Sequence, residues 1–173
     1  MDKRDYAIIG LLLVIIAMLS YGVINAYNDS QPEVFDLGNC IVTAPAGSHC
    51  HNSDGNSSIY LHENDSYPVF GVSDNGFNVE EFNLIYNSFK NGSISKNDLK
   101  GMDGGFGDGS SVIDFNVGDF KGEPEMSFIV QNPNNSSHRY LGHIVKHDNK
   151  VFMIMEEMDN PSATQMYNNL KFK

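Results

Sequence analysis

Potential metal ligands cluster at one place in the sequence. His49, Cys50 and His51 are consecutive, and a hairpin would bring His62 back across them. Imidazole nitrogens and thiolates are ligands for zinc and related transition metals. A site here would need Cys50 as a free thiolate, and the chain has no second CxxC or HxxxH spacing to complete it. We therefore predict no metal site and interpret these histidines as solvated.

The only two cysteines, Cys40 and Cys50, suggest a different chemistry. Pro45, Ala46 and Gly47 lie between them and favour a turn that brings the two thiols together. We predict a Cys40–Cys50 disulfide, which would stabilise the fold by about 2 to 3 kcal/mol in the chain-entropy model. Two free thiols in an anaerobic setting are the alternative.

No catalytic signature is present. His138, His143 and His147 fall on or beside one predicted strand pair, and we interpret them as surface residues. Ser110 or Ser111, with Asp114, could join one of the histidines in a triad on paper, but the sequence lacks a GxSxG nucleophile elbow. We predict no catalytic residue.

No cofactor signature is present either. The chain has no GxxxxGK[ST] phosphate-binding loop. Asp103 to Gly109 superficially resembles a calcium-binding turn, but its spacing and its single copy indicate a flexible loop. We predict no bound cofactor.

The net charge limits the possible partners. The 173 residues carry a formal charge of −11, and the two acidic and two basic residues among the first five cancel, so the charge belongs to the rest of the chain. An acidic surface repels nucleic acid, which we exclude as a partner. Solubility is the simplest reason for the charge, with a cation or a basic partner as the alternative.

An apolar stretch without a charge occupies the N-terminal region. Tyr6 to Ala26 is long enough to cross the hydrocarbon core of a bilayer. Lys3 and Arg4 precede it and the next basic residue is Lys90, so the positive-inside rule places the N-terminus in the cytoplasm. We predict a cytoplasmic segment over 1–5, a membrane anchor over 6–27, a tether over 28–33 and an extracytoplasmic domain over 34–173.

A cleaved signal peptide is the alternative to this anchor. Ile24 stands where a small residue is expected before the cut, and the apolar stretch is longer than a typical signal core. Both features favour an uncleaved anchor. Asn-x-Ser sequons are typical of a glycosylated outer domain, and they occur at Asn28, Asn56, Asn64, Asn91, Asn134 and Asn135.

The domain combines strands with two helices. Alternating and β-branched residues predict strands over 34–44, 58–63, 68–72, 111–117, 124–131, 139–146 and 150–157. The last four strands suggest an antiparallel meander. Val151 to Met155 is apolar on both faces, so we expect this strand at the centre of the sheet. Capping patterns at Asn78 and at Asn160-Pro161 begin the helices, and residues 93–110 form a loop rich in Gly and Asp.

This order of elements resembles a known family. An early strand, a meander and a terminal amphipathic helix that ends in ATQMYNNLKF, residues 163–172, are similar to the PsbP-type fold. The resemblance implies an α+β domain whose antiparallel sheet has flanking helices, with the final Phe172 packed on the sheet. It also implies a binding or assembly role without catalysis. The Asn-rich, acidic composition is similar to that of uncharacterised surface proteins of methanogenic archaea.

Two hypotheses about function follow. The first is a membrane-anchored, non-catalytic outer domain that binds a protein or a small ligand. The second is a hydrolase or metal-dependent enzyme whose site forms only in three dimensions. An apolar cleft without convergent titratable groups favours the first, and a pocket that gathers histidines with carboxylates favours the second.

Overall fold

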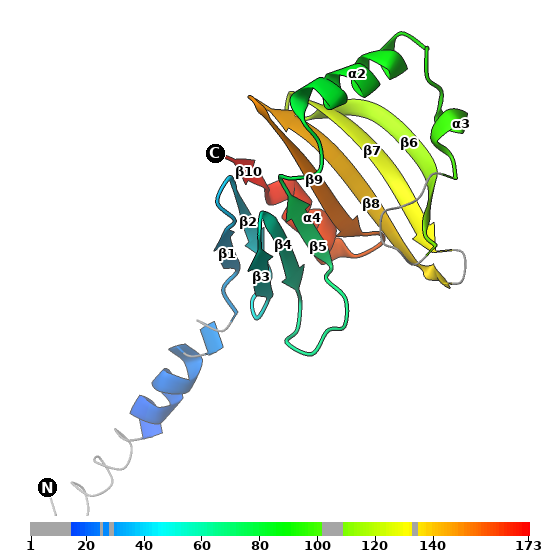
Figure 1. Cartoon of the computed structure of the whole chain (residues 1–173). Coiled ribbons are helices and arrows are strands. Elements are labelled where there is room, and N and C mark those ends of the chain that lie inside the picture. The colour runs from blue at the N-terminus through cyan, green and yellow to red at the C-terminus, as the bar shows by residue number, and fades with distance from the viewer. Residues whose placement is uncertain (1–14, 25, 28–29, 102–108, 133–134) are drawn as a thin grey trace, which may run out of the picture.

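The structure, a computed structural model, describes residues 15–24, 26–27, 30–101, 109–132 and 135–173, without the side chains of residue 132 and residues 135–138. Two antiparallel sheets carry three helices (Figure 1). The strands are β1 Glu33–Asp36, β2 Cys40–Ala44, β3 His49–Ser53, β4 Asn56–Tyr60, β5 Phe70–Ser73, β6 Ser111–Phe120, β7 Glu123–Asn132, β8 Asn135–His147, β9 Lys150–Glu157 and β10 Lys171–Phe172. The helices of the domain are α2 Val79–Lys90, α3 Lys96–Leu99 and α4 Pro161–Asn169.

The larger sheet has seven strands in the order β3-β4-β5-β9-β8-β7-β6, and the smaller sheet has the order β1-β2-β10. The predicted meander is confirmed, because β6 to β9 pair in sequence with antiparallel neighbours. β9 lies between β5 and β8, and its side chains enter two cores. The prediction of a central strand is therefore confirmed as well.

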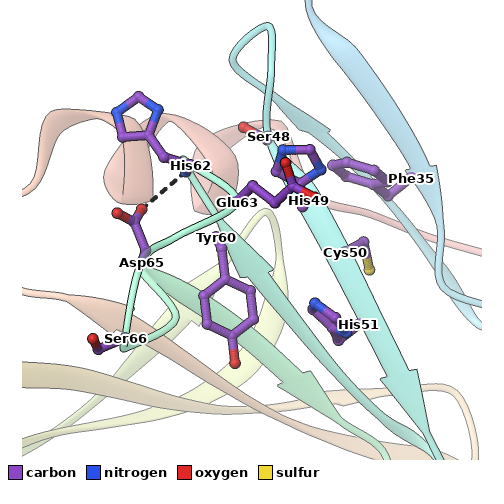
Figure 2. A pocket seen from close by; sticks show the side chains of 10 residues that line it. All are labelled: Phe35, Ser48, His49, Cys50, His51, Tyr60, His62, Glu63, Asp65 and Ser66. Atoms are coloured by element: carbon purple, nitrogen blue, oxygen red, sulfur yellow. Dashed lines mark hydrogen bonds between the residues drawn. The ribbon is translucent and has the colours of Figure 1, made fainter.

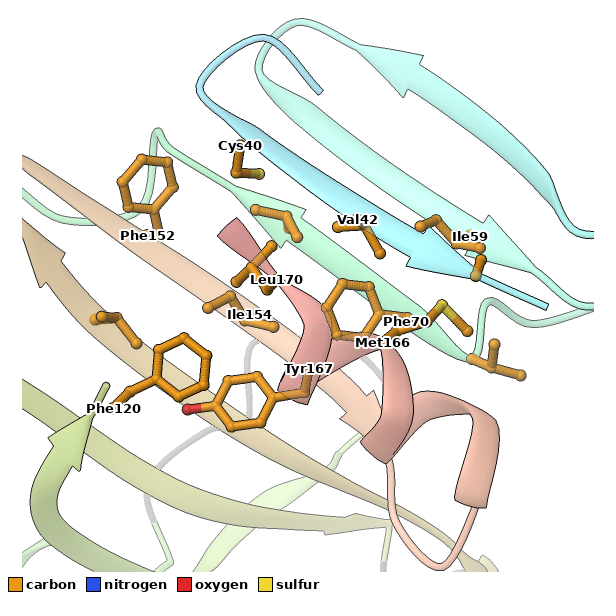
Figure 3. Close-up of a cluster of buried hydrophobic side chains, with 14 residues drawn as sticks. Cys40, Val42, Ile59, Phe70, Phe120, Phe152, Ile154, Met166, Tyr167 and Leu170 are labelled. Atoms are coloured by element: carbon orange, nitrogen blue, oxygen red, sulfur yellow. The ribbon is translucent and has the colours of Figure 1, made fainter. Parts of the chain in front are cut away.

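Each face of the larger sheet is covered by a different helix. The α4 face holds the larger core, where Met166, Tyr167 and Leu170 pack among strands of both sheets (Figure 3). The α2 face holds a second core around Phe82, over the half of the sheet that includes β6 to β9. On that same face, the other half of the sheet is not covered by α2, and this difference creates a groove described below.

Both predicted helix starts are confirmed. Asn78 accepts a hydrogen bond from the backbone of Glu81, whose side chain accepts one from the backbone of Asn78, so the capping box is complete. Asn160 accepts from the first turn of α4, with Pro161 at the start of the helix. Phe172 packs against the larger core, as the PsbP resemblance implies.

Three predictions about local structure were wrong. The strand expected over 34–44 is two strands, because Gly38 adopts a φ of 84° that reverses the chain between β1 and β2. β3 was not predicted, since its polar sequence HCHNS lacks the apolar alternation of a strand. The loop expected over 93–110 contains α3, and residues 102–108 of it, with most of the calcium-like turn, lie outside the described residues.

The predicted membrane helix lies partly outside the described residues. Residues 15–24 are helical, and their apolar side chains are exposed. No helix in the described part of the chain is long and apolar enough to cross a membrane.

The predicted disulfide is absent, and both thiols are free. Cys40 lies on β2 with 1% of its surface exposed, inside the larger core, whereas Cys50 lies on β3 in the other sheet. The Cys50 thiol donates instead to Oδ1 of Asn52 at 3.1 Å. Burial raises the pKa of Cys40 to about 11, with a further contribution from Asp74, and burial also raises the pKa of Cys50.

Candidate functional site

A buried ionic cluster lies beneath α4. His143 on β8 places Nδ1 2.5 Å from Oε1 of Glu125 on β7 and Nε2 3.1 Å from Oε1 of Glu156 on β9. The hydroxyl of Tyr167 on α4 donates to the same Glu125 oxygen at 2.6 Å, and its ring stacks on His143 with centroids 3.9 Å apart. We call these four residues the ionic cluster.

The ring of His143 is charged in this arrangement. Both ring nitrogens face carboxylate oxygens, so only the protonated ring has the two donors that the contacts require. Burial opposes the charge, but the hydrogen bonds that His143 donates to Glu125 and Glu156 outweigh it and raise the pKa of His143.

The pKa values of Glu125 and Tyr167 are shifted as well. Burial opposes ionisation of Glu125, yet the hydrogen bonds from His143 and Tyr167 lower its pKa. Burial, followed by the contact with Glu125, raises the pKa of Tyr167, so its hydroxyl stays a donor. The cluster thus places a protonated imidazole between the Glu125 carboxylate and the side chain of Glu156.

The prediction of surface histidines was wrong for His143, which is 5% exposed. His147 is half-buried, with Nδ1 3.0 Å from Oε1 of Glu123 and its ring stacked on Phe172. The side chain of His138 lies outside the described residues. Alternation along β8 explains the error, because residues 143 and 145 face α4 and its core rather than solvent.

The clustered histidines around Cys50 line a pocket but do not converge. Strand alternation turns Cys50 towards the core, opposite the core residue Ile59, while His49 and His51 lie on the other face of β3. Figure 2 shows the rings of His49, His51 and His62 turned in different directions. Among the described residues, no group of three histidine, cysteine or acidic side chains is placed to hold a metal ion.

An apolar groove of about 290 Å³ lies on the half of the sheet that α2 leaves uncovered. Its floor is formed by Ser58 and Gly71, and Met153 and Met155 line it from β9. The remaining lining residues are either apolar or polar without a charge: Asn56, Ser57, Tyr67, Pro68, Phe70, Val72, Ser73 and Tyr140. The described lining therefore contains no ionisable acid, lysine, arginine or histidine.

Two glycines on this face differ in what lies above them. Gly71 and Gly142 flank Met155 on the two neighbouring strands. A Cβ at Gly142 would meet the ring of Phe128 at 2.3 Å, so that ring already fills the space. A Cβ at Gly71 would meet only the backbone oxygen of Ser57, at 3.5 Å, so the space above Gly71 is open. The groove is this open space.

Comparison with solved structures shows a similarity of fold. The chain is similar to a cyanobacterial PsbP. The solution structure of PsbP (CyanoP) from Synechocystis sp. PCC 6803 matches with a TM-score of 0.46 and 10% sequence identity, over 83% of this chain and 92% of that chain. No protein family and no curated protein matches the chain. Likeness to PsbP at this level carries no argument about a ligand, a partner or an activity.

Neither the ionic cluster nor the groove was predicted. Three members of the ionic cluster lie on different strands, Glu125 on β7, His143 on β8 and Glu156 on β9, so no sequence spacing links them. One sequence feature could have indicated the ionic cluster. Glu156 directly follows the apolar stretch of a central strand, and a glutamate at that position is placed for burial. The groove depends on which half of the sheet α2 covers, and that is a tertiary property.

Proposed function

We propose that this protein is a membrane-anchored, extracytoplasmic, non-catalytic domain that binds a small, uncharged, mainly apolar ligand in the groove over Gly71. The observation that carries the proposal is the groove itself, which lies on one face of the sheet and is lined by methionines and tyrosines, without a carboxylate, histidine, lysine or arginine among its described lining residues.

The lining specifies the chemistry of the ligand. Thioethers such as those of Met153 and Met155 adapt to irregular shapes and make favourable contacts with aromatic rings. Tyr67 and Tyr140 add ring faces, and the backbone around Ser58 and Gly71 is close enough for a polar edge of the ligand. A volume of about 290 Å³ suits a molecule of one or two rings.

Catalysis is less well supported than binding. The residues best suited to acid–base chemistry lie beneath α4, where buried His143 contacts half-buried Glu125 and buried Glu156. The groove lies on the opposite face of the sheet. A ligand in the groove is therefore separated from these groups by the sheet.

The anchor is supported by the N-terminal region. The side chains of Ile16, Met18, Leu19 and Val23 are each more than half exposed, which is unusual for a run of large apolar residues in water. The basic residues Lys3 and Arg4 precede this run. Both features support a membrane helix whose N-terminal end faces the cytoplasm.

Binding is tested by NMR of the full chain in lipid nanodiscs, with isotope-labelled methionine methyl groups. Indole, an uncharged two-ring probe, is expected to shift the signals of Met153 and Met155 in a saturable manner. Gly71→Val fills the groove and should abolish these shifts. Gly118→Val is the matched control, because a Cβ at Gly118 meets nothing within 4 Å and lies outside the groove. Equal shifts in both variants would contradict the proposal.

The anchor is tested separately. Protease added to intact cells is expected to remove the domain and leave a short membrane-bound fragment. Protection of the whole chain would contradict the proposed topology without affecting the proposed ligand site.

A further inference from the structure

The eight methionines of the chain differ in their surroundings, and two of them line the groove over Gly71. Met153 and Met155 are alternate residues of β9, so their side chains lie on the same face of the sheet. Met126 and Met166 are 0% exposed, each inside one of the two cores. The fold therefore places one pair of methionines at an accessible surface and a second pair out of reach of solvent.

Both groove methionines, Met153 and Met155, are partly exposed. A Cβ at Gly76 would meet Cε of Met153 at 3.4 Å and its Sδ at 4.0 Å, and Gly76 is itself exposed. The thioether of Met153 thus lies beside an exposed glycine. Met155 lies between Gly71 and Gly142 on the neighbouring strands, and the space above Gly71 is open. A small solute in the groove can therefore approach both side chains.

These two thioethers can be oxidised by a hydroperoxide. They are the only sulfur atoms in the described lining, and the oxidation of sulfur side chains follows their exposure. The sulfur lone pair attacks the outer oxygen of the hydroperoxide, so an S–O bond forms and the O–O bond breaks. The proton on the transferred oxygen passes to the leaving oxygen, which departs as an alcohol or as water. The sulfur loses two electrons, the peroxide gains them, and a neutral sulfoxide results.

A sulfoxide would change what the groove accepts. Its oxygen accepts hydrogen bonds from water, and an apolar ligand that covers this oxygen removes the water without replacing the hydrogen bonds, which is unfavourable. The described lining contains no acidic residue, lysine, arginine or histidine. Two sulfoxides would therefore make a mainly apolar lining polar.

We propose that Met153 and Met155 form an oxidation site that controls the groove. In its reduced form the groove accepts an apolar ligand, and oxidation of both thioethers by a hydroperoxide closes it to that ligand. Reduction by a thiol-dependent methionine sulfoxide reductase opens it again. The control of binding rests on the proposed ligand site, whereas the oxidation itself depends only on the exposure of the two side chains.

The oxidation site is tested with hydrogen peroxide on the folded full chain in lipid nanodiscs, followed by peptide mass spectrometry. Sulfoxide is expected at Met153 and Met155 before it appears at Met126 or Met166, because the last two are buried. In urea, where the chain is unfolded, all four should react alike. Equal oxidation of the four in the folded chain would overturn the proposal.

The control of binding is tested by calorimetric titration with 1-methylindole, an uncharged two-ring probe without a hydrogen-bond donor, against empty nanodiscs as the blank. The oxidised chain is expected to bind the probe at least about tenfold more weakly than the reduced chain, because the ligand covers an unpaired polar oxygen. Equal binding by the two forms would overturn the control alone. Absence of binding to the reduced chain would contradict the proposed ligand site and, with it, the control.

Matched variants separate the groove from the other methionines. Met153→Leu combined with Met155→Leu keeps an apolar lining of similar volume without a sulfur, so it should bind the probe equally before and after peroxide. Met158→Leu is the control, because Met158 is also partly exposed but does not line the groove, and its binding should still be lost on oxidation. Loss of binding in both variants would assign the effect to oxidation elsewhere and overturn the proposal.

Discussion

The two faces of the seven-stranded sheet differ in where they place titratable side chains. Under α4, buried His143 contacts buried Glu156 and half-buried Glu125, with Tyr167 as a further donor to Glu125, whereas Oε2 of Glu156 is buried without a partner among the described residues. On the opposite face, the groove over Gly71 has no acidic residue, lysine, arginine or histidine in its described lining and is open. The titratable side chains of the ionic cluster are thus mostly withdrawn from solvent, whereas the open groove has no acidic residue, lysine, arginine or histidine in its described lining. The contrast separates residues that hold the fold together from the surface that is available to a ligand.

The strongest test of this contrast removes the charge at the centre of the ionic cluster. His143→Ala leaves the buried Glu156 and the half-buried Glu125 without their shared partner and should lower the free energy of unfolding by about 3 to 5 kcal/mol in urea titrations. His62→Ala, at an exposed position, is the control and should change it by less than about 0.5 kcal/mol. Similar small effects of both variants would mean that the cluster is not a structural centre.

The second test removes a single donor. Tyr167→Phe keeps the ring stacked on His143 but deletes the hydrogen bond to Glu125, and should cost about 1.5 to 3 kcal/mol of unfolding free energy. Tyr86→Phe is the matched control, because the Tyr86 ring also stacks, on Phe82, but its hydroxyl makes no hydrogen bond to the described residues. A loss no larger than the control's would show that the Tyr167 hydroxyl contributes little.

The third test is the pH dependence of stability. Its effect should be smaller than those of the substitutions, because a change of pH leaves the rings of His143 and Tyr167 packed. The pKa of His143 is raised, so its contribution is complete below its ordinary value of 6.5 and is lost as the pH rises through the raised value. The pKa of Glu125 is lowered, so its contribution is present above its ordinary value of 4.5 and is lost as the pH falls through the lowered value.

These two shifts predict a maximum of stability between the two ordinary values, measured as the urea midpoint across the pH range. His143→Ala should remove most of the fall on the alkaline side, although the other five histidines of the chain remain. A variant that keeps the full alkaline fall would assign the titration to a different group.

The smallest effect concerns the open face. Gly71→Val should change the free energy of unfolding by no more than about 1 kcal/mol, with a gain expected, because a β-branched residue suits a strand and the space is free. Gly142→Val should instead lose about 1 to 3 kcal/mol, because its side chain collides with Phe128. Equal losses at both glycines would mean that the groove is closed in solution.

Local patterns in the sequence predicted much of the fold. The capping residues Asn78 and Asn160 locate both main helices, since a cap depends on neighbours within one turn. The strands of the meander follow from the alternation of apolar residues, and the central position of β9 follows from a stretch that is apolar on both faces. The break at Gly38 and the strand β3 were missed, because a glycine with positive φ and a polar edge strand leave little apolar pattern.

The sequence by itself determined the acidic charge, the apolar N-terminal stretch, the α+β class and the two capped helices, because each depends on composition or on residues close in the chain. Only the tertiary structure decided that Cys40 and Cys50 remain apart, that His143 is buried between two glutamates, and that the space above Gly71 is open while the space above Gly142 is filled. These features depend on which strands are neighbours and on where a helix ends over the sheet. Such contacts join residues far apart in the chain, so no local spacing records them.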